Sequence, residues 1–331
     1  MKVLVTGGAG YIGSITTRHL LNEGHEVLVL DSLIRGRAEA VDSRASFVAG
    51  EVGDDAVLDK VLPGCDAVLH IAGLAEVAES QRLPGMYFDA NVAQPLRLLE
   101  SMCRHDVRAI VFSSTAAVYG EPETVPILED SPTRPINVYG RTKLVFEQML
   151  DAYSSAHAIR SVRFRYFNVA GAWPDGTLGE AHEPETHLIP RILRAIHQGQ
   201  GRFEIFGDDY PTHDGTCVRD YIHVCDLAHA HHLGLRHLES GGVGGVFNLG
   251  NGRGYSNLEV ARVCADITGD DLDIAIGPRR VGDPAVLVAS PQRATDILGW
   301  RQDRGGLETM IEDAWRWHSS QRNPIAAGSQ D

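Results

Sequence analysis

The sequence is poor in the features that mark membrane and nucleic-acid-binding proteins. No apolar run approaches the ~20 residues that a helix needs to span a bilayer, so we expect no membrane partner. Lys and Arg number 30 against 44 Asp and Glu, and the resulting net charge of −14 argues against nucleic acid as a partner. The five cysteines show no Cys-x-x-Cys spacing, and the first predicted strand starts at Lys2, which leaves no room for a signal peptide. We therefore expect a cytoplasmic protein with reduced thiols.

The sequence also offers little to hold a metal ion. Four of its 15 histidines lie on one predicted helix, but only His229 and His232 have i,i+3 spacing, and no Glu or Cys completes a ligand set there. We expect no metal site and a solvated helix face instead. With 331 residues, 43% of them hydrophobic, and no internal repeat, the chain fits one large or two small globular domains.

The most regular motif is a glycine-rich turn between two apolar strands. Residues 2–6 predict a strand, the sequence Gly-Gly-Ala-Gly-Tyr-Ile-Gly follows at 7–13, and residues 11–21 have helical apolar spacing. A second strand at 26–30 is closed by Asp31. This order is typical of dinucleotide sites, where glycines permit close backbone approach and the helix N-terminus takes the diphosphate. Asp31 indicates NAD, because a carboxylate accepts from a ribose 2′-hydroxyl and repels a 2′-phosphate, while Arg35 and Arg37 leave NADP as an alternative.

A Tyr-x-x-x-Lys pair lies on a later predicted helix at 137–156. Tyr139 and Lys143 are four residues apart and therefore share one helix face. A neighbouring ammonium favours the phenolate and lowers the pKa of a phenol from its ordinary value near ~10. We expect Tyr139 to act as a base that takes a proton from a hydroxyl. The spacing alone is common by chance, but beside a dinucleotide it supplies the minimal equipment for oxidising an alcohol.

Strands and helices alternate through the first half of the chain, which predicts an α/β fold with a doubly wound parallel sheet. Further strands are expected at 45–49, 67–72, 108–114 and 159–166. A helix at 86–103 contains Pro95 and is expected to kink there. Such sheets bind ligands beyond the carboxyl ends of their strands, where the glycine turn, Asp31, Gly73, residues 113–116 and Asn168 all fall.

Beyond residue 167 the alternation gives way to a mixed pattern. A helix at 188–197, a strand at 203–206 and a helix at 227–238 are expected, and a strand at 246–249 returns to the main sheet. We therefore expect a Rossmann domain over residues 1–166 and about 213–250. A smaller, discontinuous α/β domain is expected over 167–212 and 251–318, followed by a disordered tail at 319–331.

Several segments make the chain similar to the extended short-chain dehydrogenase/reductases and, among them, to the UDP-glucose 4-epimerase family. The resemblance runs from Lys2 to about Trp317, and residues 214–224 are its most diagnostic part. The other matching segments are 3–13, 70–74, 112–120, 165–168, 206–212 and 279–285. The resemblance implies an NAD-dependent isomerase that interconverts UDP-glucose and UDP-galactose. A hydride leaves C4 of the hexose for bound NAD, the keto sugar turns, and the hydride returns to the opposite face.

The resemblance also implies roles for individual residues. Tyr139 is the base, Lys143 holds the nicotinamide ribose, and the Thr115 hydroxyl bridges the sugar O4 and Tyr139. The implied NAD-binding residues are Gly7, Gly10, Tyr11, Ile12, Gly13, Asp31, Ser32, Glu51, Val52, Ile71, Ala72, Gly73, Asn91, Ser113, Tyr139, Lys143 and Tyr166. The implied UDP-hexose-binding residues are Thr115, Asn168, His187, Leu188, Phe206, Arg219, Tyr221, Arg280 and Asp283. The family also implies a homodimer formed through the helices at 86–103 and 137–156.

Three positions depart from the family pattern. Ala75 stands where many members have a lysine, and Glu51 stands where an adenine-contacting Asp is usual. Val286 occupies the position expected to gate the sugar pocket, where other members have an aromatic or a small residue. Arg219 and Arg280 can grip a diphosphate in a forked geometry, although each could instead form a surface ion pair.

Three other functions remain open. Sugar-nucleotide 4,6-dehydratases carry an acidic pair before the Val-Tyr-Gly, where this chain has Ala116 and Ala117. UDP-glucuronate decarboxylases carry a Glu in place of Ala117. A non-catalytic NAD-binding sensor would lack Tyr139 or Lys143, and both are present. The acceptance of N-acetylated or pentose UDP-sugars stays open.

Overall fold

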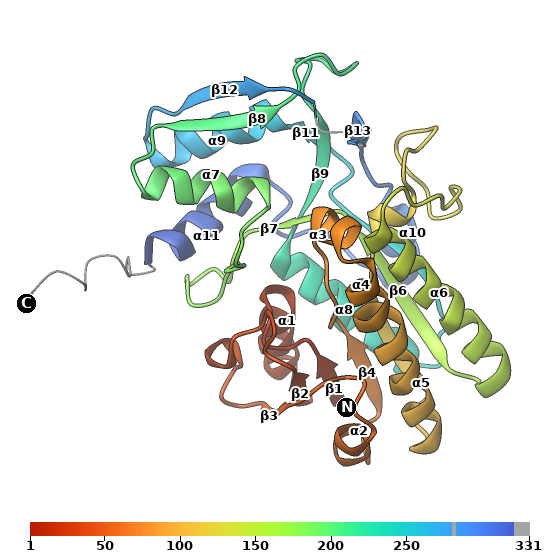
Figure 1. The fold of residues 1–331 in the computed structure, drawn as a ribbon. Coiled ribbons are helices and arrows are strands. Elements are labelled where there is room, and N and C mark those ends of the chain that lie inside the picture. The colour runs from red at the N-terminus through yellow and green to blue at the C-terminus, as the bar shows by residue number, and fades with distance from the viewer. Residues whose placement is uncertain (280–282, 321–331) are drawn as a thin grey trace, which may run out of the picture.

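The computed structural model describes residues 1–279 and 283–320. Its larger part is a seven-stranded parallel sheet in the order β10-β6-β5-β4-β1-β2-β3 (Figure 1). This confirms the predicted doubly wound sheet. The strands that form it are β1 (Lys2–Thr6), β2 (Glu26–Asp31), β3 (Ser46–Ala49), β4 (Ala67–His70), β5 (Ala109–Thr115), β6 (Arg160–Tyr166) and β10 (Gly245–Leu249).

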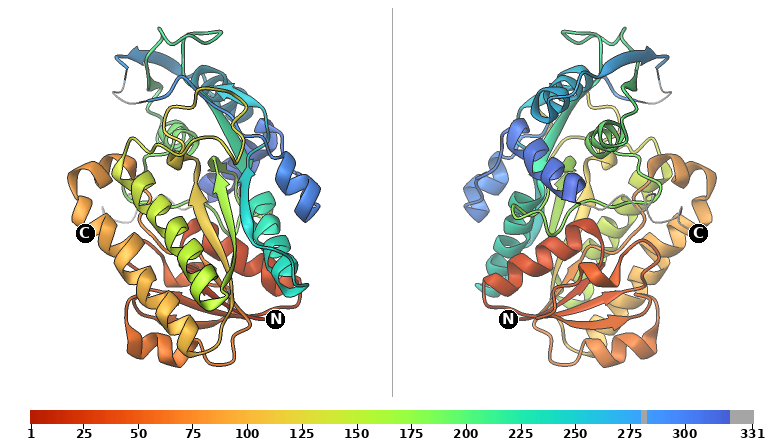
Figure 2. Two further views of the ribbon diagram at one scale, coloured as in Figure 1. Left: turned by 90° about the vertical axis from the view of Figure 1, so that its right-hand side faces the viewer. Right: turned by 90° about the vertical axis from the view of Figure 1, so that its left-hand side faces the viewer.

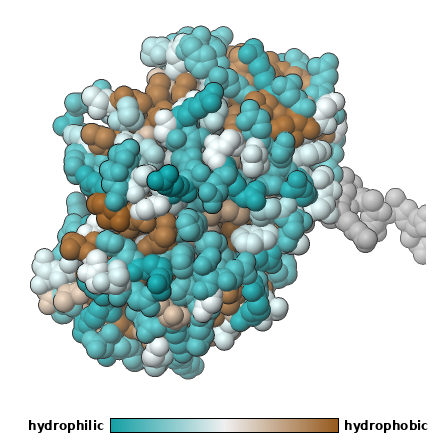
Figure 3. Space-filling model, turned by 180° about the vertical axis from the view of Figure 1, so that it is seen from behind, coloured by the Kyte–Doolittle hydropathy of each residue, from teal (hydrophilic) through white to brown (hydrophobic). Residues whose placement is uncertain are grey.

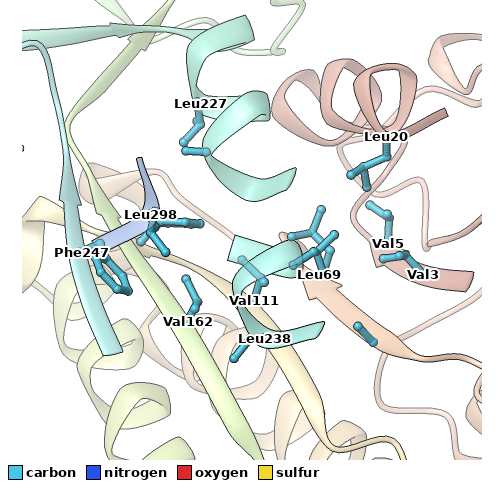
Figure 4. Packing of buried hydrophobic residues seen from close by; sticks show 14 of the residues in the cluster. Val3, Val5, Leu20, Leu69, Val111, Val162, Leu227, Leu238, Phe247 and Leu298 are labelled. Carbon is cyan, nitrogen blue, oxygen red and sulfur yellow. The ribbon is translucent and has the colours of Figure 1, made fainter. Parts of the chain in front are cut away.

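Helices cover both faces of this sheet (Figure 2). On one face lie α1 (Tyr11–Asn22) and α8 (Val224–Glu239), and on the other lie α2 (Asp55–Val61), α5 (Gln94–Arg104) and α6 (Val138–His157). Because successive strand residues point to opposite faces, Val3 and Val5 pack with Leu227 of α8, whereas Leu4 packs with Leu98 of α5. Apolar side chains therefore cover both faces of the sheet. Figure 4 shows those on the side of α1 and α8.

The helix expected at 86–103 is present as part of a helical run over residues 84–104 that contains a π-helical turn. The chain forms α3 (Val77–Arg82), α4 (Pro84–Phe88), a π-helical turn η2 (Asp89–Ala93) and then α5. Pro95 lies just after this π-helical turn, and such a turn accommodates a residue that has no N–H to donate. The irregularity expected at Pro95 is therefore a π-helical turn within one helical run. Two short 3-10 turns, η1 (Ala38–Ala40) and η3 (Ala116–Val118), follow β2 and β5.

A second unit lies over the carboxyl ends of the main strands (Figures 1 and 2). One small sheet contains β7 (Asn168–Ala170), β9 (Val218–His223), β11 (Gly254–Ser256) and β13 (Val286–Leu287), and another pairs β8 (Arg202–Phe206) with β12 (Asp273–Gly277). Its helices α7 (Leu188–His197), α9 (Asn257–Thr268) and α11 (Leu307–Ser320) share one apolar cluster, while α10 (Gln292–Leu298) packs with β10 and α8. The chain thus returns from β9 in the small sheet to β10 in the main sheet.

Helix α11 includes the first two residues of the expected tail, 319 and 320, while residues 321–331 lie outside the described residues. Across the described ranges, no helix combines the length and apolar character needed to cross a membrane. Seen from behind, the surface is mostly hydrophilic, with separate hydrophobic patches (Figure 3).

Candidate active site

A cleft of about 1490 Å³ is lined by both units of the fold. Its walls come from the glycine turn after β1, the segments after β2, β4 and β5, helix α6, and residues of the second unit. Typical small-molecule pockets measure roughly 300–1,000 Å³. The cleft therefore has room for two ligands, placed where the carboxyl ends of the parallel strands converge.

The glycine turn brings bare backbone to one end of this cleft. Gly7 has a left-handed φ of +77°, and a Cβ on it would lie 2.6 Å from the Ala72 nitrogen. A Cβ on Gly13 would lie 2.0 Å from the Gly7 carbonyl oxygen, so only glycine fits there. Gly10 caps α1 without a side-chain hydrogen bond, which leaves the amide-rich helix start to a ligand. This cradle suits a dinucleotide diphosphate.

Asp31 lies in the same part of the cleft with its carboxylate fixed by the backbone. It accepts hydrogen bonds from the Ala9 nitrogen at 2.9 Å and the Leu33 nitrogen at 2.8 Å. Arg35, one of the two residues that left NADP open, donates to both Glu79 oxygens at 2.7 and 2.9 Å and to the Glu183 carbonyl at 3.1 Å. Because its guanidinium is already engaged by a carboxylate, the geometry favours NAD.

Tyr139, Lys143 and Thr115 meet at the middle of the cleft. Helix α6 begins at Asn137, whose side chain accepts from the Gly140 nitrogen at 2.7 Å, so Tyr139 lies in the first turn and Lys143 one turn later. The Thr115 hydroxyl, at the end of β5, hydrogen-bonds to the Tyr139 phenol. The Lys143 ammonium donates to the Ser113 carbonyl at 3.0 Å. The predicted trio is thus brought together around one point.

The expected effect of Lys143 on the Tyr139 pKa is wrong for the ligand-free protein. Burial raises the pKa of Tyr139 to about 12, and the hydrogen bond from Thr115 opposes this only in part. Burial also lowers the pKa of Lys143 to about 8. The Lys143 charge is directed at the Ser113 carbonyl, so desolvation of the phenolate outweighs it.

Most of the predicted NAD-binding residues line the cleft, but two lie behind its wall. Asn91 is buried and holds the turn after β4, since its side chain accepts from the Leu74 nitrogen and donates to the Leu74 carbonyl, both at 2.9 Å. The Ser113 hydroxyl pairs with His231 Nε2 at 3.0 Å. The lining residues are Gly7, Gly10, Tyr11, Ile12, Gly13, Asp31, Ser32, Glu51, Val52, Ile71, Ala72, Gly73, Tyr139, Lys143 and Tyr166.

The residues predicted to bind UDP-hexose divide in a similar way. Those that line the cleft are Thr115, Asn168, His187, Arg219 and Asp283, whereas Leu188, Phe206 and Tyr221 do not. Arg280 lies outside the described residues. Leu188 and Tyr221 pack with the apolar cluster of the second unit.

The sequence argument for a diphosphate site depended on Arg219 and Arg280. Of these two, Arg219 lies within the described residues and lines the cleft. Its Nη1 donates to the carbonyls of Val218 and Pro284 at 2.9 and 2.8 Å, and its Nη2 lies 4.0 Å from Asp283. These backbone contacts fix one edge of the guanidinium, and the side chain lines the cleft. The arrangement suits a forked grip on an anion.

Val286, the residue expected to gate the sugar pocket, points away from the cleft. Val286 does not line the cleft, whereas Leu287 does. Strand β13 runs parallel to β9 with Leu287 opposite Arg219, so these two residues lie on the same face of the sheet. The period-2 alternation of the strand therefore turns Val286 away from the site. Only the register with β9 reveals this.

The loop before α7 supplies lining residues that the sequence argument missed. Glu180, His182 and Glu185 face the cleft together with His187. The sequence showed only an irregular run rich in Pro, Gly, His and charged residues there. Its alternating Glu and His could have raised a metal-ligand hypothesis, because these side chains are common ligands.

Comparison with known proteins agrees with this geometry. The family model described as the NAD dependent epimerase/dehydratase family matches residues 3–250. The chain belongs to this family. A UDP-glucose 4-epimerase from Halalkalibacterium halodurans is 49% identical to it, over 100% of this chain and 99% of the relative.

Two solved structures of UDP-glucose 4-epimerases match this member of the epimerase family closely. The Brucella ovis protein in complex with NAD is 43% identical, with a TM-score of 0.92 over 96% of this chain and 98% of its own. The Stenotrophomonas maltophila protein, with bound NAD and formylated UDP-arabinopyranose, is 40% identical, with a TM-score of 0.93 over 97% and 98%. The resemblance and the fold class inferred from the sequence are thereby confirmed.

Proposed function

We propose that this chain is an NAD-dependent UDP-glucose 4-epimerase that interconverts UDP-glucose and UDP-galactose. The observation that carries the proposal is one continuous cleft with the dinucleotide cradle at one end, the Tyr139–Thr115–Lys143 group in the middle and Arg219 at the other end. NAD held by the glycine turn and Asp31 would supply the hydride acceptor and donor for C4 of the hexose. The high identity to named UDP-glucose 4-epimerases over the full chain supports the same activity.

The protein's own residues move the proton. Thr115 and Tyr139 both line the cleft and share a hydrogen bond, so the Thr115 hydroxyl can relay a proton between the sugar O4 and the phenol. The pKa of Tyr139, about 12 without ligands, must fall on binding for the phenol to act near neutral pH. Lys143, whose pKa of about 8 keeps it largely cationic at pH 7, lines the same cleft and would help hold the cofactor and favour the phenolate.

The substrate is held by its nucleotide more than by its sugar. Arg219 and Arg280 bind the diphosphate and offset the repulsion expected from a chain with a net charge of −14. Asn168, His187 and Asp283 line the cleft and add polar contacts. Leu188 and Tyr221 pack in the apolar cluster behind this wall and support it. A firm hold on UDP with a loose hold on the hexose allows the keto sugar to turn before the hydride returns.

The division of labour follows the two units. Most of residues 1–166 and 224–250 belong to the NAD-binding unit, whereas residues 167–212 and 251–318, together with strand β9 and its Arg219, form the UDP-sugar-binding unit. Several apolar side chains are exposed along α3, α4 and α5, namely Val77, Leu83, Met86, Phe88 and Leu96. They support a homodimer formed through the helices around 86–103 and 137–156. Five free cysteines support a cytoplasmic location.

The test separates epimerisation from the rival activities. The protein is incubated with UDP-galactose and the products are resolved by chromatography, with Tyr139→Phe as the matched inactive control. UDP-glucose is the expected product. A 4-keto-6-deoxy sugar would instead indicate elimination, although Ala116 and Ala117, which line the cleft, offer no acid or base for it. No product in the presence of NAD would overturn the proposal and favour a sensor.

A further inference from the structure

Four side chains of the loop before α7 converge at the edge of the cleft. Glu180, His182, Glu185 and His187 each bring one nitrogen or oxygen atom into a group whose members all lie within 4.8 Å of one another. Glu180 Oε1 lies 3.0 Å from His182 Nδ1 and 2.9 Å from His187 Nδ1. Glu185 Oε1 lies 3.2 Å from His187 Nδ1. The group has two imidazoles and two carboxylates, and nothing in the proposed epimerisation requires this combination.

Glu185 gives an independent indication that the group binds a ligand. Its side chain is only 3% exposed, yet its Oε2 is buried without a hydrogen-bond partner among the described residues. The guanidinium of Arg194 lies 4.0 Å away, beyond hydrogen-bonding distance. A buried carboxylate oxygen that no donor reaches is costly unless a cation compensates it.

We propose that Glu180, His182, Glu185 and His187 form a binding site for a divalent cation of the zinc class. Two imidazole nitrogens and two carboxylate oxygens form a donor set that suits zinc. Bonds of ~2.1 Å to a tetrahedral ion place neighbouring ligand atoms about 3.4 Å apart. Three of the spacings within the group are 2.9–3.2 Å and all lie within 4.8 Å, so the ligand atoms surround a point that an ion could occupy after side-chain adjustment.

The cation would fasten the loop that carries these ligands, here called the strap (residues 180–187). The strap is already tied to the NAD-binding unit, since Arg35 donates to the Glu183 carbonyl at 3.1 Å and Thr186 donates to Glu76. The His182 ring also lies edge-on to Tyr11, with centroids 6.5 Å apart. The ion would therefore stiffen one wall of the cleft. Coordination through Nδ1 leaves the Nε2 of His187 free to donate to a ligand.

The competing reading is that protonated histidines alone hold the cluster together. In that reading the charges of Glu180 and Glu185, which outweigh the opposing effect of burial, keep the pKa of His187 well above its ordinary value. The two readings differ in a measurable way, because only the first predicts one tight equivalent of metal. A second histidine group, which includes His25 and His232 with ring nitrogens 3.1 Å apart, provides the internal control.

The experiment uses the full chain, freed of metal with a chelator. Zn²⁺ is titrated by calorimetry, and Co²⁺ is titrated as a spectroscopic probe of the coordination geometry. We expect one equivalent to bind, with visible bands of four-coordinate Co²⁺ and a raised melting temperature. His182→Gln and Glu185→Gln should each weaken binding at least ~10-fold, the smallest loss typical even of an outer-shell partner. The His229→Gln/His232→Gln double variant should bind like the parent.

Several results would overturn the proposal. Absence of stoichiometric Zn²⁺ and Co²⁺ binding in the parent protein would refute it without recourse to any variant. Equal affinity in parent, His182→Gln and Glu185→Gln would exclude the strap, and loss of binding only in the His229→Gln/His232→Gln variant would move the site to the other histidine group. Epimerase activity is not the readout, so failure here is distinguishable from failure of the proposed function.

Discussion

Replacement of Ala75 by lysine should tighten NAD binding. Ala75 lines the cleft just after the Ala72–Gly73 turn that faces the glycine loop. Many members of the family have a lysine at this position, and alanine supplies no charge to the cofactor diphosphate. Arg35, the nearby candidate to replace it, is engaged by Glu79 at 2.7 and 2.9 Å. We therefore expect the natural protein to lose NAD readily and to gain activity when NAD is added.

The magnitude follows from the position of residue 75. A hydrogen bond that involves a charged group contributes ~1.5–3 kcal/mol. Ala75 is exposed, so solvent screening places the gain at the lower end, about tenfold in affinity. NAD occupancy after extended dialysis is measured by native mass spectrometry, and the dissociation constant is measured by calorimetry.

Ala75→Met is the matched control, because it adds similar length without charge. If Ala75→Met retains NAD as well as Ala75→Lys does, bulk rather than charge is responsible. If the natural protein keeps a full complement of NAD and its activity is indifferent to added cofactor, the reasoning about Ala75 is refuted.

Three further predictions concern catalysis, specificity and acid stability. Tyr139→Phe should lower turnover at least ~100-fold while UDP-glucose affinity changes only a few-fold, and near-normal turnover would remove the phenol from the mechanism. UDP-GlcNAc and UDP-GalNAc should be turned over measurably. Leu287→Tyr should selectively suppress turnover of these N-acetylated substrates, whereas Val286→Tyr should not. Equal effects of the two variants in a substrate panel would contradict the assignment of Leu287 to the pocket wall. Burial lowers the pKa of His70 to about 3 and of His231 to about 4. The free energy of unfolding should therefore fall as pH drops from about 6.5 towards these values, by roughly 3 kcal/mol for His231. Urea unfolding from pH 7 to 4.5 measures the loss, and an unchanged slope in His231→Gln would refute the role of that residue.

The acid prediction depends on a fixed tautomer of His231. Its Nδ1–H donates to the Leu227 carbonyl at 2.8 Å, so its Nε2 must accept from the Ser113 hydroxyl at 3.0 Å. Protonation of Nε2 would make it a donor, so the Ser113 hydroxyl would have to rotate and accept, and a charged imidazolium would be buried. The Ser113 carbonyl in turn receives the Lys143 ammonium, so acid should disturb the catalytic group as well as the core.

Local patterns in the sequence determined the elements that carry the chemistry. The glycine turn was predictable because steric limits act within a few residues, and Gly13 has room only for a hydrogen beside the Gly7 carbonyl. Helix α7 occupies the expected residues 188–197, and α6 carries Tyr139 and Lys143 on one face as the i,i+4 rule requires. These features depend on backbone geometry and spacing alone.

Tertiary structure decided the features that depend on neighbours distant in the chain. The pKa of Tyr139 rises because burial outweighs the hydrogen bond from Thr115, while the Lys143 ammonium is engaged by the Ser113 carbonyl. The spacing of residues on a helix contains neither fact. Leu287 rather than Val286 faces the cleft because β13 pairs with β9 in one particular register. The Glu and His side chains of the strap converge only when the loop folds back over the cleft. Desolvation, strand register and loop closure are properties of the packed chain, so they become visible only in three dimensions.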